Sequence, residues 1–183
     1  MPTRLHGIKK IAFTGSHGTG KTTLATALAT EIDIPIIEER ARLFEQMGFE
    51  LNTGAVLQTQ LLMLFDQLAA ESNPFAAWVA DRCLIDYLAY SMSITVPPPK
   101  NIIALLESNI YWLMQNRYDH IFYVPTGKIK LLSDSLRPDD AAYQLVIDEN
   151  IKYYLKHMSI PYHEIQSVTL TDRVQEVLEV IYP

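Results

Sequence analysis

Eight consecutive residues near the N-terminus constrain the fold of this chain more than any other feature. They are Gly15-Ser16-His17-Gly18-Thr19-Gly20-Lys21-Thr22, and they fit the pattern GxxxxGK[ST] in full. An apolar run at 8–14 precedes them, and an amphipathic run at 21–32 follows them. A strand, a glycine-rich turn and a helix in this order are the context of a phosphate-binding loop. We therefore expect an α/β fold.

The residue types of this loop explain how it would hold a triphosphate. Glycines allow backbone conformations that a Cβ forbids, and successive N–H groups then point into one concavity that binds phosphate oxygens. Lys21 supplies a full positive charge near the β and γ phosphates, and the Thr22 hydroxyl is a ligand for Mg²⁺. We expect His17 to face solvent or nucleotide. The residues predicted to bind ATP, or another nucleoside triphosphate, are Gly15, Ser16, His17, Gly18, Thr19, Gly20, Lys21, Thr22 and Thr23.

Short apolar runs alternate with longer amphipathic ones along the rest of the chain. The predicted strands are 8–14, 34–37, 76–80, 120–124 and 162–166. The predicted helices are 21–32, 40–49, 54–72, 84–94, 100–116, 141–157 and 172–181, the last capped by Thr171 or Asp172. Helical crossovers between strands indicate a three-layer α/β sandwich, with a mainly parallel five-stranded sheet and helices on both faces. The helix at 54–72 carries a stripe that we expect to pack into the core: Leu57, Leu61, Leu64, Phe65 and Leu68.

Length and composition indicate how many domains the chain has, where the protein is located and which partners are excluded. The 183 residues suit one domain spanning 1–183. The single cysteine, Cys83, cannot form an intramolecular disulfide, which indicates a reducing compartment and predicts a cytoplasmic protein. A net charge of −6 argues against nucleic acid as a partner, and no apolar run is long enough for a membrane helix. The helices rich in Leu and Tyr fit either core packing or the face of a homodimer.

Two other classes of phosphate-binding-loop protein fit the sequence less well. GTPases carry an N/TKxD motif, but the segment at 126–129 reads TGKI and lacks the aspartate. AAA-type ATPases need an apolar strand that ends in Asp-Glu, a sensor and an additional helical lid domain. The segment at 36–39 reads IIEE, but it lies too close behind the first helix, and too little chain remains for that domain. A short chain with a basic loop in its C-terminal third fits a small-molecule kinase better.

Acidic and basic residues follow the second predicted strand. Ligand groups collect at the carboxyl ends of parallel strands, and Glu39 lies at such an end. Its carboxylate could accept the proton of an attacking hydroxyl or hold that hydroxyl in line. Arg42 follows three residues later, so it shares a helix face with Glu39 and is expected to hold the substrate.

A second acidic and basic pair ends the third predicted strand. Asp81 occupies the position at which a carboxylate holds Mg²⁺ through water, or acts as the base in place of Glu39. Arg82 is expected to grip a phosphate or hydroxyl of the substrate. Asp86 and Tyr87 lie about one turn further on and are predicted to bind substrate as well.

The segment at 126–140 is expected to form a lid. It carries Lys128, Lys130 and Arg137. A basic loop that closes over the phosphates excludes water and stabilises charge in the transition state. Arg137 precedes Pro138 and the next predicted helix, and is the arginine predicted to act in catalysis.

These motifs together resemble the P-loop nucleoside and nucleotide kinase superfamily. Within it, the chain is most similar to the small AAA/kinase-like ATPases related to the ribosylnicotinamide kinase domain. The matching residues are the loop at 15–22, Glu39 and Arg42, the series Asp81, Arg82, Asp86, Ala89 and Tyr90, and Leu136-Arg137-Pro138. The pairs Asp81-Arg82 and Ala89-Tyr90 also look like thymidylate kinase, in which the matching arginine contacts the acceptor phosphate. The resemblance implies use of ATP and Mg²⁺ with a small hydroxyl or phosphate acceptor.

The function predicted from the sequence is phosphoryl transfer to a nucleoside, a nucleotide or a similar small metabolite. In this reading Lys21, Glu39, Asp81, Arg82 and Arg137 are catalytic. One alternative is a P-loop NTPase or nucleotide-binding switch that acts with a protein partner. Another is a kinase of nucleic-acid ends or modified bases, against which the net charge weighs.

Overall fold

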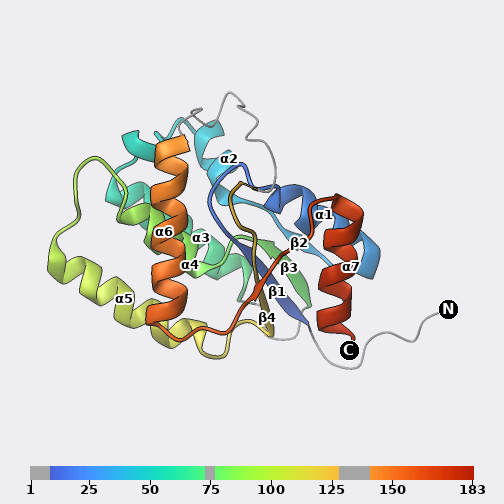
Figure 1. Cartoon of the computed structure of the whole chain (residues 1–183). Coiled ribbons are helices and arrows are strands. Elements are labelled where there is room, and N and C mark those ends of the chain that lie inside the picture. Colours follow the sequence, from blue (N-terminus) through green and yellow to red (C-terminus); the bar gives the residue numbers. More distant parts are fainter. Residues whose placement is uncertain (1–8, 73–76, 128–140) are drawn as a thin grey trace.

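A computed structural model describes residues 9–72, 77–127 and 141–183 of the chain. In these residues the strands form one five-stranded sheet in the order β2-β3-β1-β4-β5, and every neighbouring pair is parallel (Figure 1). The strands are β1 (Lys10–Thr14), β2 (Ile36–Ile37), β3 (Trp78–Asp81), β4 (His120–Tyr123) and β5 (His163–Glu164). The predicted parallel sheet is therefore confirmed, although β2 and β5 are shorter than expected.

Helices cover both faces of the sheet. They are α1 (Lys21–Ile32), α2 (Arg40–Gln46), α3 (Leu57–Ala70), α4 (Leu84–Ser91), α5 (Lys100–Met114), α6 (Ala141–His157) and α7 (Leu170–Ile181). Helices α1 and α7 contact each other on one side, whereas α3, α5 and α6 pack around α4 on the other (Figure 1). A short 3-10 turn, η1 (Asn52–Gly54), precedes α3. This arrangement confirms the three-layer α/β sandwich.

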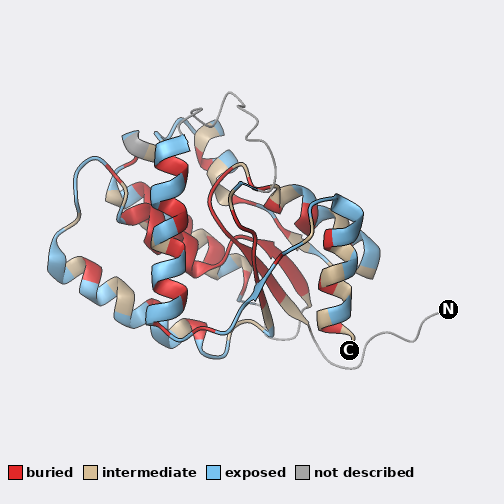
Figure 2. Cartoon of the chain, in the orientation of Figure 1, coloured by how far each residue is buried: buried red, intermediate tan, exposed pale blue. Residues whose placement is uncertain are grey.

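The central strand β1 contributes to a hydrophobic core on each side of the sheet. Ile11 and Phe13 pack in the cluster beneath α1 and α7, whereas Ala12 belongs to the larger cluster beneath α3 to α6. All three side chains are buried, and Figure 2 shows the central strands of the sheet in the colour of buried residues. A strand that is buried on both faces needs a continuous apolar sequence, which is why this run could be recognised before the structure.

The helix α3 differs from the prediction in the face that it buries. Its buried residues are Thr59, Gln60, Met63, Leu64 and Gln67. Of the predicted stripe, Leu64 is buried but Phe65 is 62% exposed. The helix also starts at Leu57, not at Gly54. The expected core face is therefore wrong at Phe65, whereas Leu64 lies in the core and Leu68 packs against it. The buried face also carries Gln60 and Gln67, and Gln67 accepts a hydrogen bond from Tyr87 on α4.

Smaller corrections concern the ends of elements. The N-cap of α7 is Thr169, whose Oγ1 accepts a hydrogen bond from the Asp172 amide at 3.2 Å, so neither Thr171 nor Asp172 is the cap. The predicted starts of the first and third strands, at Ile8 and Ala76, lie outside the described residues. Across the described ranges, the search for a helix long and apolar enough to cross a membrane finds none.

Candidate active site

The phosphate-binding loop joins the end of β1 to the start of α1. Gly15 has φ +142°, and a Cβ built there would lie 2.5 Å from the carbonyl oxygen of Val124. Gly18 and Gly20 also have positive φ, at +71° and +85°. Glycine is favoured at such conformations because it has no Cβ. The loop therefore needs glycine at Gly15 for two reasons, its conformation and the close approach of the chain that follows β4.

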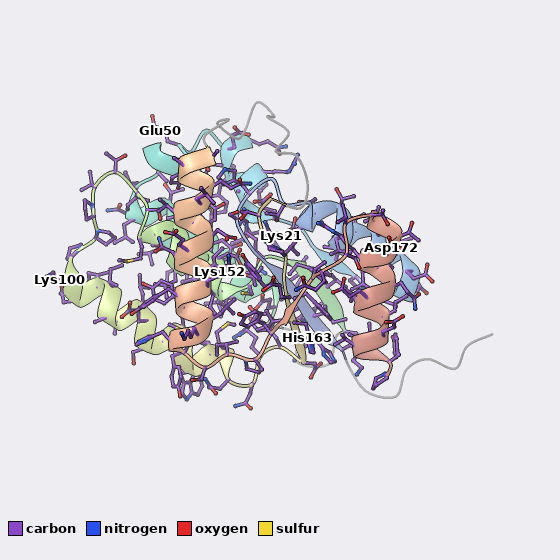
Figure 3. All side chains as sticks on the ribbon, in the orientation of Figure 1. Lys21, Glu50, Lys100, Lys152, His163 and Asp172 are labelled. Atoms are coloured by element: carbon purple, nitrogen blue, oxygen red, sulfur yellow. The ribbon has the colours of Figure 1, made fainter. Side chains whose placement is uncertain are left out.

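Lys21 is held inside this loop. Its Nζ donates to the carbonyl oxygen of Ser16 at 2.5 Å and contacts Thr19 Oγ1 at 3.4 Å. Burial and, next, the nearby Arg82 lower the pKa of Lys21 to about 8, against the opposing effect of neighbouring carboxylates. In Figure 3 Lys21 lies at the edge of the sheet where β1 ends. A triphosphate bound in the loop would bring negative charge to this ammonium and stabilise its protonated form.

Thr22 and Asp81 form the pair that fits a magnesium ion. Thr22 Oγ1 donates to Asp81 Oδ2 at 2.5 Å. Asp81 Oδ1 is buried and, among the described residues, accepts no hydrogen bond. Burial and then the nearby Glu39 carboxylate raise the pKa of Asp81. Mg²⁺ is commonly held by one or two protein ligands together with waters and substrate phosphates, so a hydroxyl and an unsatisfied carboxylate oxygen at one point suit it.

Arg82 joins two buried carboxylates beside this pair. Its Nε donates to Glu39 Oε1 at 2.7 Å, and its Nη2 lies 2.5 Å from the same oxygen. Its Nη1 donates to Asp86 Oδ1 at 3.2 Å. The backbone of Arg82 has φ +111°, a conformation that favours glycine. Strain of this kind persists where surrounding contacts hold it and is concentrated at functional sites.

Asp86 links this cluster to the phosphate-binding loop. Its Oδ2 accepts a hydrogen bond from the Cys83 amide at 2.9 Å, which caps the start of α4. Its Oδ1 accepts one from the Gly15 amide at 3.4 Å. The carboxylate therefore fixes α4, Arg82 and the loop in one arrangement.

A pocket lies next to these charges, and we call it the Glu39 pocket. Glu39, Arg82 and Asp86 line one part of it, and His17 lines it from the phosphate-binding loop. Other lining residues are the apolar Leu51, Met63 and Tyr87 and the amides Asn52 and Gln60. Glu39 and Arg42 also line a groove that contains Thr22 and Asp81. Glu39 thus faces both the pocket and the proposed metal pair, which is the arrangement needed to bring an acceptor group to a bound phosphate.

A family model described as an AAA domain matches residues 10–173. The chain belongs to this AAA-domain family. The match covers the phosphate-binding loop and every strand, and it confirms the resemblance stated from the sequence. No curated protein matches the chain significantly.

Solved structures show which fold this AAA domain shares. NadR in complex with NR is 22% identical with a TM-score of 0.76, over 95% of this chain and 52% of that chain. Deoxyadenosine kinase from M. mycoides with bound dATP is 18% identical with a TM-score of 0.70, over 95% of this chain and 100% of that chain. Thymidylate kinase from Ehrlichia chaffeensis is 17% identical with a TM-score of 0.65, over 96% of this chain and 99% of that chain. The chain spans about half the length of NadR, and at these identities the likeness establishes the fold alone.

The structure of the AAA domain brings most of the predicted site residues together. Lys21, Thr22 and Asp81 meet at the loop, and the residues predicted to bind substrate all line the Glu39 pocket: Glu39, Arg42, Arg82, Asp86 and Tyr87. Their roles stay predictions. Arg137, with Lys128, Lys130 and nearly all of the predicted lid at 126–140, lies outside the described residues.

His17 was expected to face solvent or nucleotide. The residue is 2% exposed and lines the Glu39 pocket, so it does not face solvent, and a contact with nucleotide stays a prediction. Tyr143 and Gln144 were missed as neighbours of the site: Gln144 Nε2 donates to the His17 carbonyl oxygen at 2.7 Å, and the rings of Tyr143 and His17 lie 5.8 Å apart. Both come from α6, far along the chain, and no local pattern indicates such a contact.

Gln67 was also missed, and the sequence does contain a signal for it. Its Oε1 accepts from the Tyr87 hydroxyl at 3.2 Å, and its Nε2 donates to Glu71 at 2.7 Å. Gln60, Gln67 and Glu71 lie seven and four residues apart, so they share one face of a helix. The sequence therefore also allowed the prediction that α3 buries a polar stripe beside its leucines.

Proposed function

We propose that this protein transfers the γ-phosphoryl group of ATP, with Mg²⁺, to a hydroxyl of a nucleoside, a nucleotide or a similar small molecule. The observation that carries the proposal is the position of Glu39, which lines a pocket on one side and the groove of Thr22 and Asp81 on the other. A carboxylate between a pocket and a phosphate-binding loop can accept the proton of a hydroxyl aimed at the γ-phosphorus.

The residues of the loop would bind and orient the triphosphate. Its N–H groups and Lys21 hold the phosphate oxygens, and Thr22 and Asp81 would hold Mg²⁺. The ion, when bound, neutralises charge on the β and γ phosphates. The predicted lid residue Arg137 would add a further cation. Because phosphoryl transfer depends mainly on positioning and charge stabilisation, these groups account for most of the chemistry.

The acceptor would occupy the Glu39 pocket. Its hydroxyl oxygen forms the new bond to phosphorus as the bond between phosphorus and the β–γ bridging oxygen breaks, and its proton passes to a carboxylate. Glu39 is the base that we favour over Asp81, because Asp81 Oδ2 already accepts the Thr22 hydroxyl and its remaining oxygen suits the metal. Arg82 keeps Glu39 in place.

The charges of the pocket favour an acceptor that is itself uncharged. Arg82 is already balanced by Glu39 and Asp86, and Arg42 is the other arginine among the lining residues. Two carboxylates and two arginines leave no net positive charge to attract a phosphate-bearing acceptor. A nucleoside-like molecule, with apolar and amide contacts from Leu51, Met63 and Gln60, fits this lining better than a nucleotide.

The relatives support the same class of reaction. Two of the structures with this fold are named as a deoxyadenosine kinase and a thymidylate kinase. The cytoplasmic location stays a prediction from the sequence. A homodimer stays a prediction.

The test is a transfer assay with ATP, Mg²⁺ and a panel of nucleosides and nucleoside monophosphates, read by mass spectrometry. We expect at least one nucleoside to gain a phosphoryl group, and the Glu39→Gln variant to lose this activity while still binding ATP. Stoichiometric hydrolysis of ATP with no phosphorylated acceptor across the panel would overturn the proposal. It would favour an NTPase or a switch that acts on a protein partner.

A further inference from the structure

His17 belongs to the phosphate-binding loop, yet its ring lies in the neighbouring pocket. The side chain is 2% exposed and lines the Glu39 pocket together with Arg82 and Tyr90. Two successive residues of α6 hold it. Gln144 Nε2 donates to its carbonyl oxygen at 2.7 Å, and the Tyr143 ring lies 5.8 Å from the imidazole. The backbone of His17 and the orientation of its ring are therefore fixed together, so a change in the loop would move the ring.

The ring is connected to Arg82 through one hydroxyl. His17 Nδ1 lies 3.3 Å from Tyr90 Oη, and Arg82 Nη2 lies 3.3 Å from the same oxygen. A guanidinium can only donate, so the Tyr90 oxygen accepts from Arg82. Burial raises the pKa of Tyr90, so its hydroxyl keeps a hydrogen. The tautomer of His17 decides whether Nδ1 accepts this hydrogen or donates its own to the same oxygen, and either bond connects the ring to Arg82.

The series of contacts from His17 through Tyr90 and Arg82 ends at the Glu39 carboxylate. Arg82 donates to Glu39 through Nε at 2.7 Å, and its guanidinium lies 4.8 Å from the centre of the Tyr90 ring. The guanidinium is planar and rigid. A displacement of Tyr90 Oη at one end would therefore turn the group that holds Glu39 at the other.

We propose that His17 is a positioning residue that connects the state of the phosphate-binding loop, through Tyr90 and Arg82, to the orientation of the Glu39 carboxylate. The proposal rests on the proposed function, since it assumes that the loop binds a nucleotide. It goes beyond that function because it gives a residue of the phosphate-binding loop a role in orienting the carboxylate that faces the acceptor. A nucleotide that fixes the conformation of the loop would also fix the orientation of the Glu39 carboxylate and so raise the affinity for the acceptor. By linkage, a bound acceptor would raise the affinity for the nucleotide by the same factor.

The experiment uses the full chain labelled with ¹⁵N and adenylyl imidodiphosphate with Mg²⁺ as the probe. In the free protein, the nitrogen shifts of His17 show which ring nitrogen carries the hydrogen and so give the direction of the bond to Tyr90. The amide signals of Lys21 and Thr22 report whether the nucleotide binds. The Nε–H signal of Arg82 reports whether the guanidinium that holds Glu39 changes its surroundings. We expect the nucleotide to shift all three signals in the wild-type protein.

Variants show whether the shift at Arg82 depends on the contacts through His17 and Tyr90 or is a direct effect of the phosphate charge. Tyr90→Phe keeps the ring but removes the hydroxyl, and His17→Leu removes Nδ1. At nucleotide concentrations that saturate the Lys21 and Thr22 signals of each variant, we expect the shift at Arg82 to fall to half or less. His17→Asn offers an oxygen near the position of Nδ1 and should restore part of it. Tyr154→Phe is the matched control, because its hydroxyl bonds to Glu107 away from the site, and it should leave the shift unchanged.

Two results would overturn the proposal, and they differ. An Arg82 shift of wild-type size in Tyr90→Phe and His17→Leu, with normal shifts at Lys21 and Thr22, would show that His17 has no positioning role and would leave the proposed function standing. No shift at Lys21 and Thr22 in the wild-type protein would show that the loop does not bind the nucleotide. The proposed function would then fail, and this proposal with it.

Discussion

The nucleotide half and the acceptor half of the candidate site are built from different interactions. The nucleotide half is the contiguous segment 15–23, and its shape depends on backbone conformation, such as the positive φ of Gly15 and Gly20. The acceptor half gathers side chains from α2, α3 and α4, and its charges satisfy one another. Arg82 binds Glu39 and Asp86 at the same time, and all three are buried.

This difference predicts how each half responds to substitution. A variant that removes a charged side chain from the nucleotide half removes a group that awaits a ligand, so it should impair binding or turnover and spare the fold. A variant in the acceptor half leaves a partner charge buried and unpaired, which costs stability as well. The free energy of unfolding and the rate of phosphoryl transfer should therefore separate the two halves.

The largest effect on folding is expected for Arg82→Gln. This variant leaves the Glu39 and Asp86 carboxylates buried without their shared cation, and removal of one member of a buried ion pair costs about 3–5 kcal/mol. Urea unfolding followed by circular dichroism measures the loss. Arg40→Gln is the control, since Arg40 pairs at 3.2 Å with the more exposed Asp66, and such surface pairs contribute about 1 kcal/mol or less. Equal losses in the two variants would refute the distinction between the halves.

Lys21→Ala should reduce phosphoryl transfer by about 10³-fold and leave the fold intact. Loss of a group that stabilises transition-state charge typically costs about 10²–10³-fold in rate. Because burial disfavours the charged ammonium of Lys21 in the free protein, its removal should not lower the free energy of unfolding. Transfer rates and urea midpoints of both proteins check this. Equal transfer rates would contradict the assignment of the loop.

How much the sequence predicts also differs between the halves. The loop could be read from Gly15 to Thr22 because its residues are contiguous and each has a local chemical reason. Glu39, Asp81 and Arg82 could be placed because parallel strands bring their carboxyl ends to one edge, and the structure shows Glu39 and Arg82 in contact.

The rest depends on tertiary packing that no local pattern records. Gln144 reaches His17 from 127 positions away along the chain. The direction of the His17 ring follows from that contact and from Tyr90 on α4, which were unknown before the helices were packed. On α3 the leucines drew attention because they are apolar, but the glutamines face inward because the site beside them is polar. Sequence reasoning therefore missed contacts between helices that are far apart along the chain or packed side by side, such as Gln144 with His17 and Gln67 with Tyr87.

Gly15→Ala should impair the nucleotide half through its backbone. The new Cβ would lie 2.5 Å from the Val124 carbonyl oxygen at φ +142°, and strain and crowding of this kind cost about 2–3 kcal/mol. Gly48→Ala is the matched control, because Gly48 also has a positive φ of +87° but nothing lies within 4 Å of a Cβ there. We expect Gly15→Ala to lower stability more than Gly48→Ala and to weaken binding of ADP. Equal losses would show that the backbone conformation, and not the contact with Val124, decides the cost.

The smallest effect is the pH dependence of nucleotide affinity. The pKa of Lys21 is about 8 in the free protein because burial disfavours its charge. A bound triphosphate favours the protonated form, so above pH 8 the protein must take up a proton to bind, and affinity should fall by up to about tenfold for each further pH unit. Calorimetric titration with a non-hydrolysable ATP analogue, in buffers of different ionisation enthalpy, measures both the affinity and the proton uptake. Lys21→Arg should bind with no such pH dependence, because a guanidinium keeps its charge throughout this range. If the wild-type protein and Lys21→Arg gave the same flat profile, the ammonium would not be the group that meets the phosphates, and the nucleotide half would depend on its backbone N–H groups alone.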